Sequence, residues 1–146
     1  MGGPSLNAGP SALPPGPPFL LDTHVWLWYL LGSDRLPRSL AAAIDDAAGA
    51  IWLSPISVWE ACMLHERGRL TFEGGPRRWI EAALRAFPVE EAALTGQVAI
   101  RSHEVDLGHR DPADHLLAAS ALVHGLTLVT LDERLMAAPW LTTRSN

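Results

Sequence analysis

Three short apolar runs recur along the chain, and each is followed by a segment with helical features. The runs are FLL at 19–21, AIWL at 50–53 and LTLV at 126–129. A strand that is buried on both faces has this uninterrupted apolar character, which is typical of parallel sheets covered by helices. Strands that alternate with helices favour the same architecture. The pattern therefore predicts an α/β domain with three layers, α/β/α, around a central, mainly parallel sheet.

Local signals give the expected helix boundaries. Asp22 and Gly32 enclose the first helix, Ser54 and Pro55 begin another, and Asp111 begins a helix that Gly125 ends. Asp and Ser are favoured N-cap residues, Pro is favoured in the first turn and Gly after the last. Further helices are predicted over 36–49, 74–86, 90–103 and 131–138, a short strand over 87–90, and an edge strand over 139–144.

The length of 146 residues suits a single domain. Residues 1–17 are rich in Gly, Pro and Ser and are expected to form a disordered tail, with the folded domain spanning 18–146. Cys62 is the only cysteine, so no intramolecular disulfide can form, which fits a reducing cytoplasmic setting. No stretch reaches the ~20 apolar residues of a membrane-spanning helix, and a cytoplasmic protein without membrane contact is expected.

Four carboxylates fall where strands end or the following helices begin. Asp22 comes directly after the first apolar strand and Asp132 just past the strand LTLVT, while Glu60 and Asp114 lie in early turns of predicted helices. Ligands of open parallel sheets bind outside the carboxyl ends of the strands. The four side chains are therefore expected to converge in one crevice.

Clustered carboxylates need a counter-charge, because like charges so close together raise each other's pKa. A hard divalent cation provides it, and oxygen-only ligands select Mg²⁺ or Mn²⁺ over zinc. Such an ion activates water and neutralises charge on a phosphoryl oxygen. The expected chemistry is phosphodiester hydrolysis, with one or two ions.

Each acid also has a purely structural interpretation. Asp22, Asp111 and Asp132 can cap helices, and Asp114 can favour the dipole of its helix from the first turn. For Asp111, which directly precedes Pro112, we favour the capping role. The coincidence of so many acids at one sheet edge favours a site for the others.

The basic residues and histidines narrow the alternatives. The net charge is −5, and all 11 basic residues are Arg. An acidic chain is not an obvious nucleic-acid binder, although Arg is the better fork for phosphate. The absence of Lys argues against a phospho-receiver or an aspartyl-phosphate phosphohydrolase. His103, His109 and His115 are six residues apart, a spacing that does not place them on one helix face and that disfavours a zinc site.

The segments LLDTHVWLW, SPISVWEACMLHERGRL, HRDPADHLLAASA and TLVTLD, in this order, resemble the PIN-domain ribonucleases. Within them the chain is similar to the VapC-type toxins of bacterial type II toxin–antitoxin systems. The resemblance covers residues 19–140. It implies a PIN-like nuclease domain and an endoribonuclease that depends on Mg²⁺ or Mn²⁺ and cuts single-stranded or looped RNA.

By this resemblance, the catalytic and metal-binding residues are Asp22, Glu60, Asp114 and Asp132, and the supporting residues are Asp111 and Thr130. Arg110 and His24 lie next to site acids and are candidates for contacting RNA phosphate, with Arg110 preferred. The resemblance also implies a homodimer and a cognate antitoxin that lays a peptide across the active-site groove. Operator DNA is bound only through the antitoxin. The RNA target remains open.

Three positions depart from the family pattern. Leu64 stands where a Lys is frequent, Ala113 replaces an aromatic residue, and His115 replaces an Arg. These departures concern the grip on RNA and the fit of the antitoxin more than metal binding. The alternative is a catalytically decayed PIN-like module that acts through antitoxin or RNA binding. The four intact acids argue against it.

Overall fold

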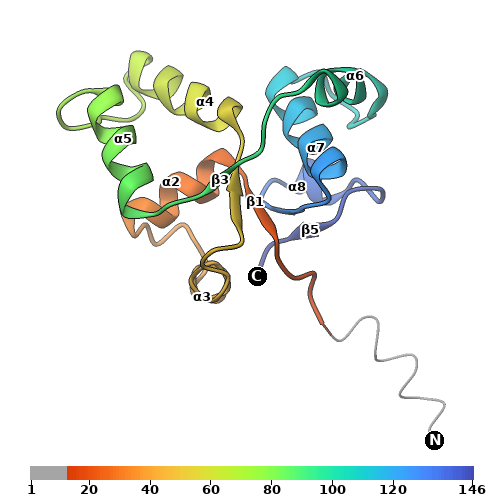
Figure 1. The fold of residues 1–146 in the computed structure, drawn as a ribbon, viewed down its shortest axis with the longest axis horizontal. Helices are drawn as coiled ribbons and strands as arrows, with labels where there is room; N and C mark the ends of the chain where they lie inside the picture. The colour runs from red at the N-terminus through yellow and green to blue at the C-terminus, as the bar shows by residue number, and fades with distance from the viewer. Residues whose placement is uncertain (1–12) are drawn as a thin grey trace, which may run out of the picture.

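The computed structural model describes residues 13–146 and contains a sheet of five parallel strands. The strands are β1 (Phe19–Leu21), β2 (Ile51–Leu53), β3 (Glu90–Glu91), β4 (Thr127–Val129) and β5 (Thr143–Arg144). Their order across the sheet is β3-β2-β1-β4-β5, and every neighbouring pair is parallel (Figure 1). The predicted parallel sheet is confirmed, and β1 lies at its centre.

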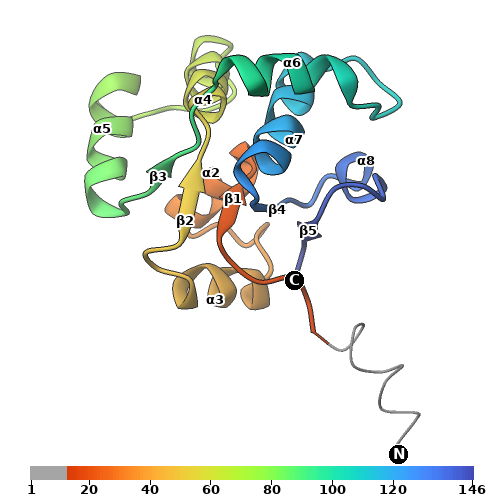
Figure 2. The same ribbon diagram turned by 45° about the vertical axis from the view of Figure 1, so that its right-hand side comes forward.

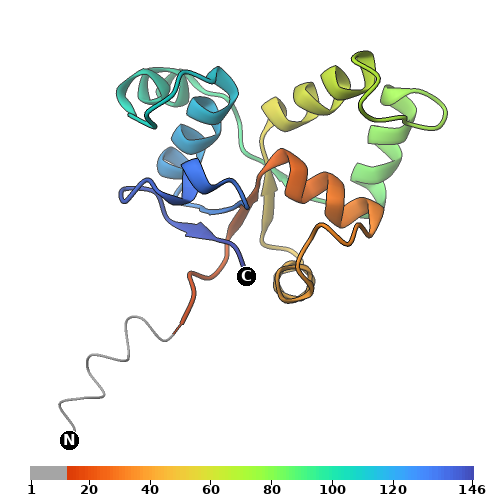
Figure 3. The same ribbon diagram turned by 180° about the vertical axis from the view of Figure 1, so that it is seen from behind.

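Helices cover the sheet on both sides, which completes the predicted α/β/α layers. One side carries α2 (Thr23–Leu31), α3 (Arg38–Asp46), α4 (Pro55–Glu66) and α5 (Pro76–Ala86). The other carries α6 (Gly96–Glu104), α7 (Pro112–His124) and α8 (Glu133–Met136). Figures 1 and 3 show the two groups from opposite directions. Among the described residues, no helix is long and apolar enough to cross a membrane.

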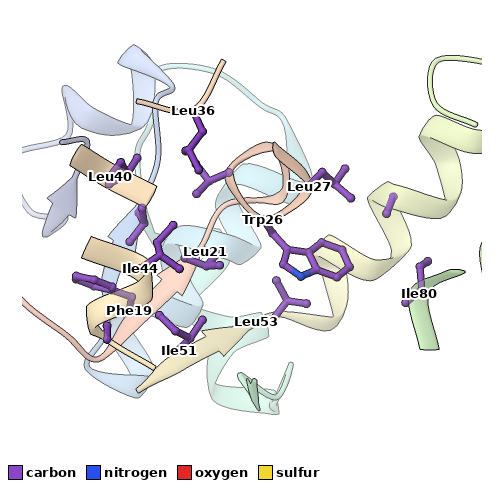
Figure 4. Packing of buried hydrophobic residues seen from close by; sticks show 14 of the residues in the cluster. Phe19, Leu21, Trp26, Leu27, Leu36, Leu40, Ile44, Ile51, Leu53 and Ile80 are labelled. Carbon is purple, nitrogen blue, oxygen red and sulfur yellow. The ribbon is translucent and has the colours of Figure 1, made fainter. Parts of the chain in front are cut away.

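The central strand supplies side chains to a separate core on each face of the sheet. Phe19 and Leu21 belong to the cluster beneath α2 and α3, where Trp26 is fully buried (Figure 4). Leu20 belongs to the opposite cluster, with Leu117 of α7. Successive strand residues point to opposite faces. A strand covered on both faces must therefore be apolar throughout, which explains the uninterrupted FLL run.

The predicted helix caps are present. The Ser54 side chain accepts a hydrogen bond from the Ile56 N–H, and the Asp111 side chain accepts one from the Ala113 N–H. Gly32 and Gly125 end α2 and α7 with φ angles of 60° and 67°. These positive values place both residues in the left-handed region, where glycine meets no steric penalty.

Several expected boundaries are wrong. The strand expected over 87–90 lies at Glu90–Glu91, and the edge strand expected over 139–144 is confined to Thr143–Arg144. The helix predicted over 90–103 begins only at Gly96, because Glu90 and Glu91 pair with β2 and Thr95 caps the helix by accepting from the Val98 N–H. The helix predicted over 36–49 spans Arg38–Asp46, and residues 47–49 form a turn before β2. Most of the predicted tail, residues 1–12, lies outside the described residues, so the division at residue 18 stays a prediction.

Candidate active site

A cleft of about 370 Å³ opens at the carboxyl ends of the strands and brings the four predicted acids together. Asp22 follows β1, Asp132 follows β4 and caps α8, Glu60 comes from α4, and Asp114 lies in the first turn of α7. In Figure 2, β1 and β2 run in the same direction, with α4 beyond their carboxyl ends. The parallel arrangement of the strands therefore produces the expected convergence.

Asp22 is fixed by hydrogen bonds at both carboxylate oxygens. Its Oδ1 accepts from the Thr23 N–H at 2.7 Å, and its Oδ2 accepts from the Thr130 hydroxyl at 2.7 Å. The Thr130 hydroxyl oxygen also accepts from the Asp132 N–H at 3.0 Å. Burial raises the pKa of Asp22 above its usual value, although both hydrogen bonds act in the opposite direction.

Glu60 is tied to the same edge through Thr23. The Thr23 hydroxyl lies 2.5 Å from Glu60 Oε1 and 2.9 Å from the Ser57 hydroxyl. A hydroxyl has one proton, so Thr23 donates to the carboxylate and accepts from Ser57. Burial raises the pKa of Glu60, and the charges of Asp22 and Asp111 raise it further.

Asp114 is crowded by three other acids of the cleft. Burial, followed by the charges of Asp111, Asp22 and Asp132, raises its pKa to about 7. Its Oδ2 lies 3.5 Å from Arg134 Nη2 and 3.5 Å from His109 Nε2. Perturbed carboxylates that share a cleft are typical of functional sites.

Asp132 differs because it has a strong cationic partner. Burial alone would raise its pKa, but hydrogen bonds and the charge of Arg134 lower it below its usual value. Arg134 Nη2 lies 3.1 Å from Asp132 Oδ2, and the Arg134 side chain is 57% exposed. This guanidinium contacts two of the four acids and neutralises part of the charge of the cleft.

The donor set fits a hard divalent cation, with waters completing its coordination. Within residues 13–146, no three His, Cys, Asp or Glu side chains are arranged to hold an ion by themselves. Mg²⁺ usually keeps several waters and binds through one or two carboxylates, so a closed protein cage is not required. Burial, with a further contribution from neighbouring carboxylates, raises the pKa values of Asp22, Glu60 and Asp114, and a bound cation would stabilise their ionised forms.

The other predicted site residues divide between two places. Asp111 lines the cleft while capping α7, and the buried Thr130 bridges Asp22 and Asp132. His24 also lines the cleft, but Arg110 does not and instead lines a separate groove with His103. The roles of all these residues stay predictions.

Sequence reasoning missed three residues that contact the acids: Thr23, His109 and Arg134. Arg134 lies two residues after Asp132 and twenty residues after Asp114, and it contacts both acids. No local sequence pattern predicts its contact with Asp114. The sequence predicts Thr23 only as the first residue of a helix. The Asp22-Thr23 pair directly after a strand was the available signal.

A second groove of about 360 Å³ adjoins the cleft and runs along α4 beside the beginning of α7. Its apolar side chains include Ile56, Trp59, Met63 and Leu116, and Trp59 is 55% exposed. His24, Glu60 and Asp111 line both the groove and the cleft. A chain bound in this groove would therefore lie beside the acids.

Both the sequence and the fold of the chain match known proteins. The PIN domain family matches residues 19–141. Ribonuclease VapC22 of Mycobacterium tuberculosis is 32% identical over 117 residues, which cover 80% of this chain and 88% of that protein. This identity and coverage indicate membership of the same family as well as a similar fold.

Solved structures agree at the level of the fold. VapBC2 from Rickettsia felis bound to a promoter DNA fragment matches with a TM-score of 0.65 at 16% identity, covering 86% of this chain and 96% of that chain. DNA-bound VapBC from Salmonella typhimurium matches with a TM-score of 0.65 at 18% identity and the same coverage. From its sequence match and its fold, the chain belongs to the PIN domain family.

Proposed function

We propose that this chain is a divalent-metal-dependent endoribonuclease and the toxin of a type II toxin–antitoxin system. One observation carries the proposal: Asp22, Glu60, Asp114 and Asp132 line one cleft at the carboxyl edge of a PIN-domain sheet. The similarity to a protein named Ribonuclease VapC22 supports RNA as the substrate.

The four carboxylates would hold Mg²⁺ or Mn²⁺, and Asp22 is firmly oriented because both of its oxygens accept hydrogen bonds from buried threonines. The bound ion supplies an activated water and neutralises charge on the phosphoryl oxygens. Thr130 and Thr23 keep Asp22 and Glu60 aimed at the cleft.

Cationic and polar groups at the cleft would position the RNA backbone. Arg134 and His24 line the cleft itself, so they can reach a phosphate beside the acids. Arg110, the residue preferred from the sequence, lies in the separate groove and would contact the strand farther from the scissile bond. A guanidinium offers phosphate a fork of donors.

We propose three partners besides RNA: a second copy of the chain, a cognate antitoxin, and operator DNA bound through the antitoxin. The structural neighbours are described as VapBC assemblies bound to DNA. The apolar groove with exposed Trp59 is where we place the antitoxin peptide. The setting would be cytoplasmic.

The test is cleavage of a structured RNA by the purified protein with Mg²⁺, with Mn²⁺, or with EDTA. Asp22→Asn keeps the size of the side chain and removes its charge, and we expect it to abolish cleavage. Asp46→Asn is the matched control, because Asp46 is an exposed acid at the end of α3, outside the cleft.

The outcomes separate the two candidate functions. Metal-dependent cleavage that Asp22→Asn abolishes and Asp46→Asn preserves supports the nuclease. A folded wild-type protein that binds its antitoxin but cuts no RNA with either metal would favour the decayed binding module. Equal cleavage by wild type and Asp22→Asn would contradict the metal site.

A further inference from the structure

His109 lies in the loop before α7 and is held from one side by the backbone. The Asp111 N–H donates to His109 Nδ1 at 3.2 Å. The His109 side chain is only 16% exposed. Because Nδ1 accepts a hydrogen bond here, the neutral ring must carry its own proton on Nε2.

The other ring nitrogen of His109, Nε2, faces Asp114 in the cleft. Among the described residues, His109 Nε2 is buried without a hydrogen-bond partner, and Asp114 Oδ2 lies 3.5 Å away. A buried donor left unpaired is rare in folded proteins. A contraction of a few tenths of an ångström would bring this pair to normal hydrogen-bond length (~3 Å).

His115 provides a built-in comparison, because its surroundings require the opposite tautomer. His115 Nδ1 lies 2.8 Å from the Asp111 carbonyl oxygen, which can only accept. His115 must therefore carry a proton on Nδ1. The two rings meet edge to face with their centres 5.8 Å apart, so they are neighbours that differ in tautomer because their backbone partners differ.

We propose that His109 is a positioning residue for Asp114: its neutral Nε2–H donates to Asp114 Oδ2 and leaves the other carboxylate oxygen free to bind a divalent cation. This inference rests on the proposed metal-dependent function of the cleft. Carboxylates that bind a metal ion are themselves held by hydrogen bonds from outer-shell groups in many proteins.

A neutral donor suits this task better than the guanidinium on the other side. Arg134 also approaches Asp114 Oδ2, but it carries a full positive charge and is largely exposed. A cationic partner competes electrostatically with a metal ion for the same carboxylate. A neutral imidazole held by the Asp111 N–H orients the carboxylate without repelling the ion.

The first test uses the wild-type, metal-free protein. Nitrogen-15 chemical shifts of the imidazole rings distinguish the two neutral tautomers. We expect the Nε2–H form for His109 and the Nδ1–H form for His115 in the same spectrum near pH 8. An Nδ1–H form at His109 would overturn the inference, whether or not the protein binds a metal ion.

The second test compares two amide variants by Mn²⁺ binding, followed by electron paramagnetic resonance. In His109→Asn the amide reaches as far as Nδ1 and can keep the contact with Asp111. In His109→Gln the amide reaches as far as Nε2 and can donate to Asp114. We expect Mn²⁺ binding roughly ten-fold weaker in His109→Asn, as for outer-shell residues elsewhere, and near wild type in His109→Gln.

Asp114→Asn separates failure of this inference from failure of the proposed function. If Asp114→Asn weakens Mn²⁺ binding while His109→Asn does not, the positioning role is wrong and the metal site stands. Equal weakening by His109→Asn and His109→Gln would also overturn the positioning role, since only the turn would then matter. If Asp114→Asn binds Mn²⁺ like wild type, the metal site itself is wrong, and the role of His109 falls with it.

Discussion

The Thr130 hydroxyl donates to Asp22 Oδ2 at 2.7 Å and thereby joins the ends of two neighbouring strands, β1 and β4. The same oxygen accepts from the Asp132 N–H. One buried hydroxyl therefore orients two of the four acids. The contact spans 108 residues of sequence and depends on the parallel pairing of the strands.

Replacing Thr130 with Val keeps the shape of the side chain and removes both hydrogen bonds. Because Thr130 is fully buried, the Asp132 N–H loses its acceptor, at a cost of about 1–3 kcal/mol in the free energy of unfolding. Urea denaturation measures this loss, and RNA cleavage should fall as well. Thr130→Ser keeps the hydroxyl and is the control. Wild-type stability and cleavage in Thr130→Val would show that this bridge is unimportant.

The raised pKa of Asp114 makes the stability of the metal-free protein depend on pH. Its pKa is about 7 in the folded protein, against 3.8 for an unperturbed Asp. The folded state therefore binds more protons than the unfolded state between these values, so stability rises as the pH falls through this window. Above pH 7 the ionised, crowded carboxylate destabilises the fold.

Denaturation in EDTA at pH 5 and pH 8 checks this sign. Wild type should gain stability relative to Asp114→Asn on going from pH 8 to pH 5, because only wild type takes up the proton. Asp22 and Glu60 also have raised pKa values and contribute equally to both proteins as a first approximation. A wild-type advantage that grows with pH would contradict the assignment.

Arg134→Gln should tighten metal binding. The Arg134 guanidinium contacts Asp132 and Asp114 and competes with a cation for them. Ion pairs of an exposed guanidinium are weak, so we expect Mn²⁺ affinity to rise by only roughly two- to five-fold by titration calorimetry. Arg101→Gln removes a surface ion pair with Glu104 on α6, outside the cleft, and should leave the Mn²⁺ affinity unchanged. Weaker binding in Arg134→Gln would reverse this interpretation.

Met63→Glu should weaken binding of the antitoxin. Met63 lines the apolar groove beside Trp59, and a carboxylate introduced there would lose its hydration when a peptide covers the groove. Surface plasmon resonance with the immobilised antitoxin measures the effect, for which we expect at least a ten-fold loss. Glu66→Gln at the end of α4 is the matched control, because Glu66 does not line the groove. Unchanged affinity in Met63→Glu would place the antitoxin elsewhere.

Local sequence signals predicted the elements that they control directly. Asp111, Pro112 and Gly125 specify the ends of α7, and both ends lie where they were expected. The convergence of Asp22 and Asp132 was predictable because parallel strands end at one edge. In each of these cases, the cause lies within a few residues or in the topology itself.

Long-range contacts explain what the sequence did not reveal. Glu90 and Glu91 have no strand propensity of their own and are extended because they pair with β2. Arg134 reaches Asp114 because α8 and α7 lie on the same side of the sheet. The contact of His109 with Asp114 is not predictable from local sequence, because it depends on how the loop folds back before α7.

The most direct measurement is anomalous diffraction at the manganese edge from a crystal soaked in Mn²⁺. We predict an anomalous peak in the cleft, within bonding distance of carboxylate oxygens of Asp22 and Asp114, and its loss in a crystal of Asp114→Asn. A crystal of catalytically active protein without a manganese peak in this cleft would contradict the claim that these acids form the metal centre.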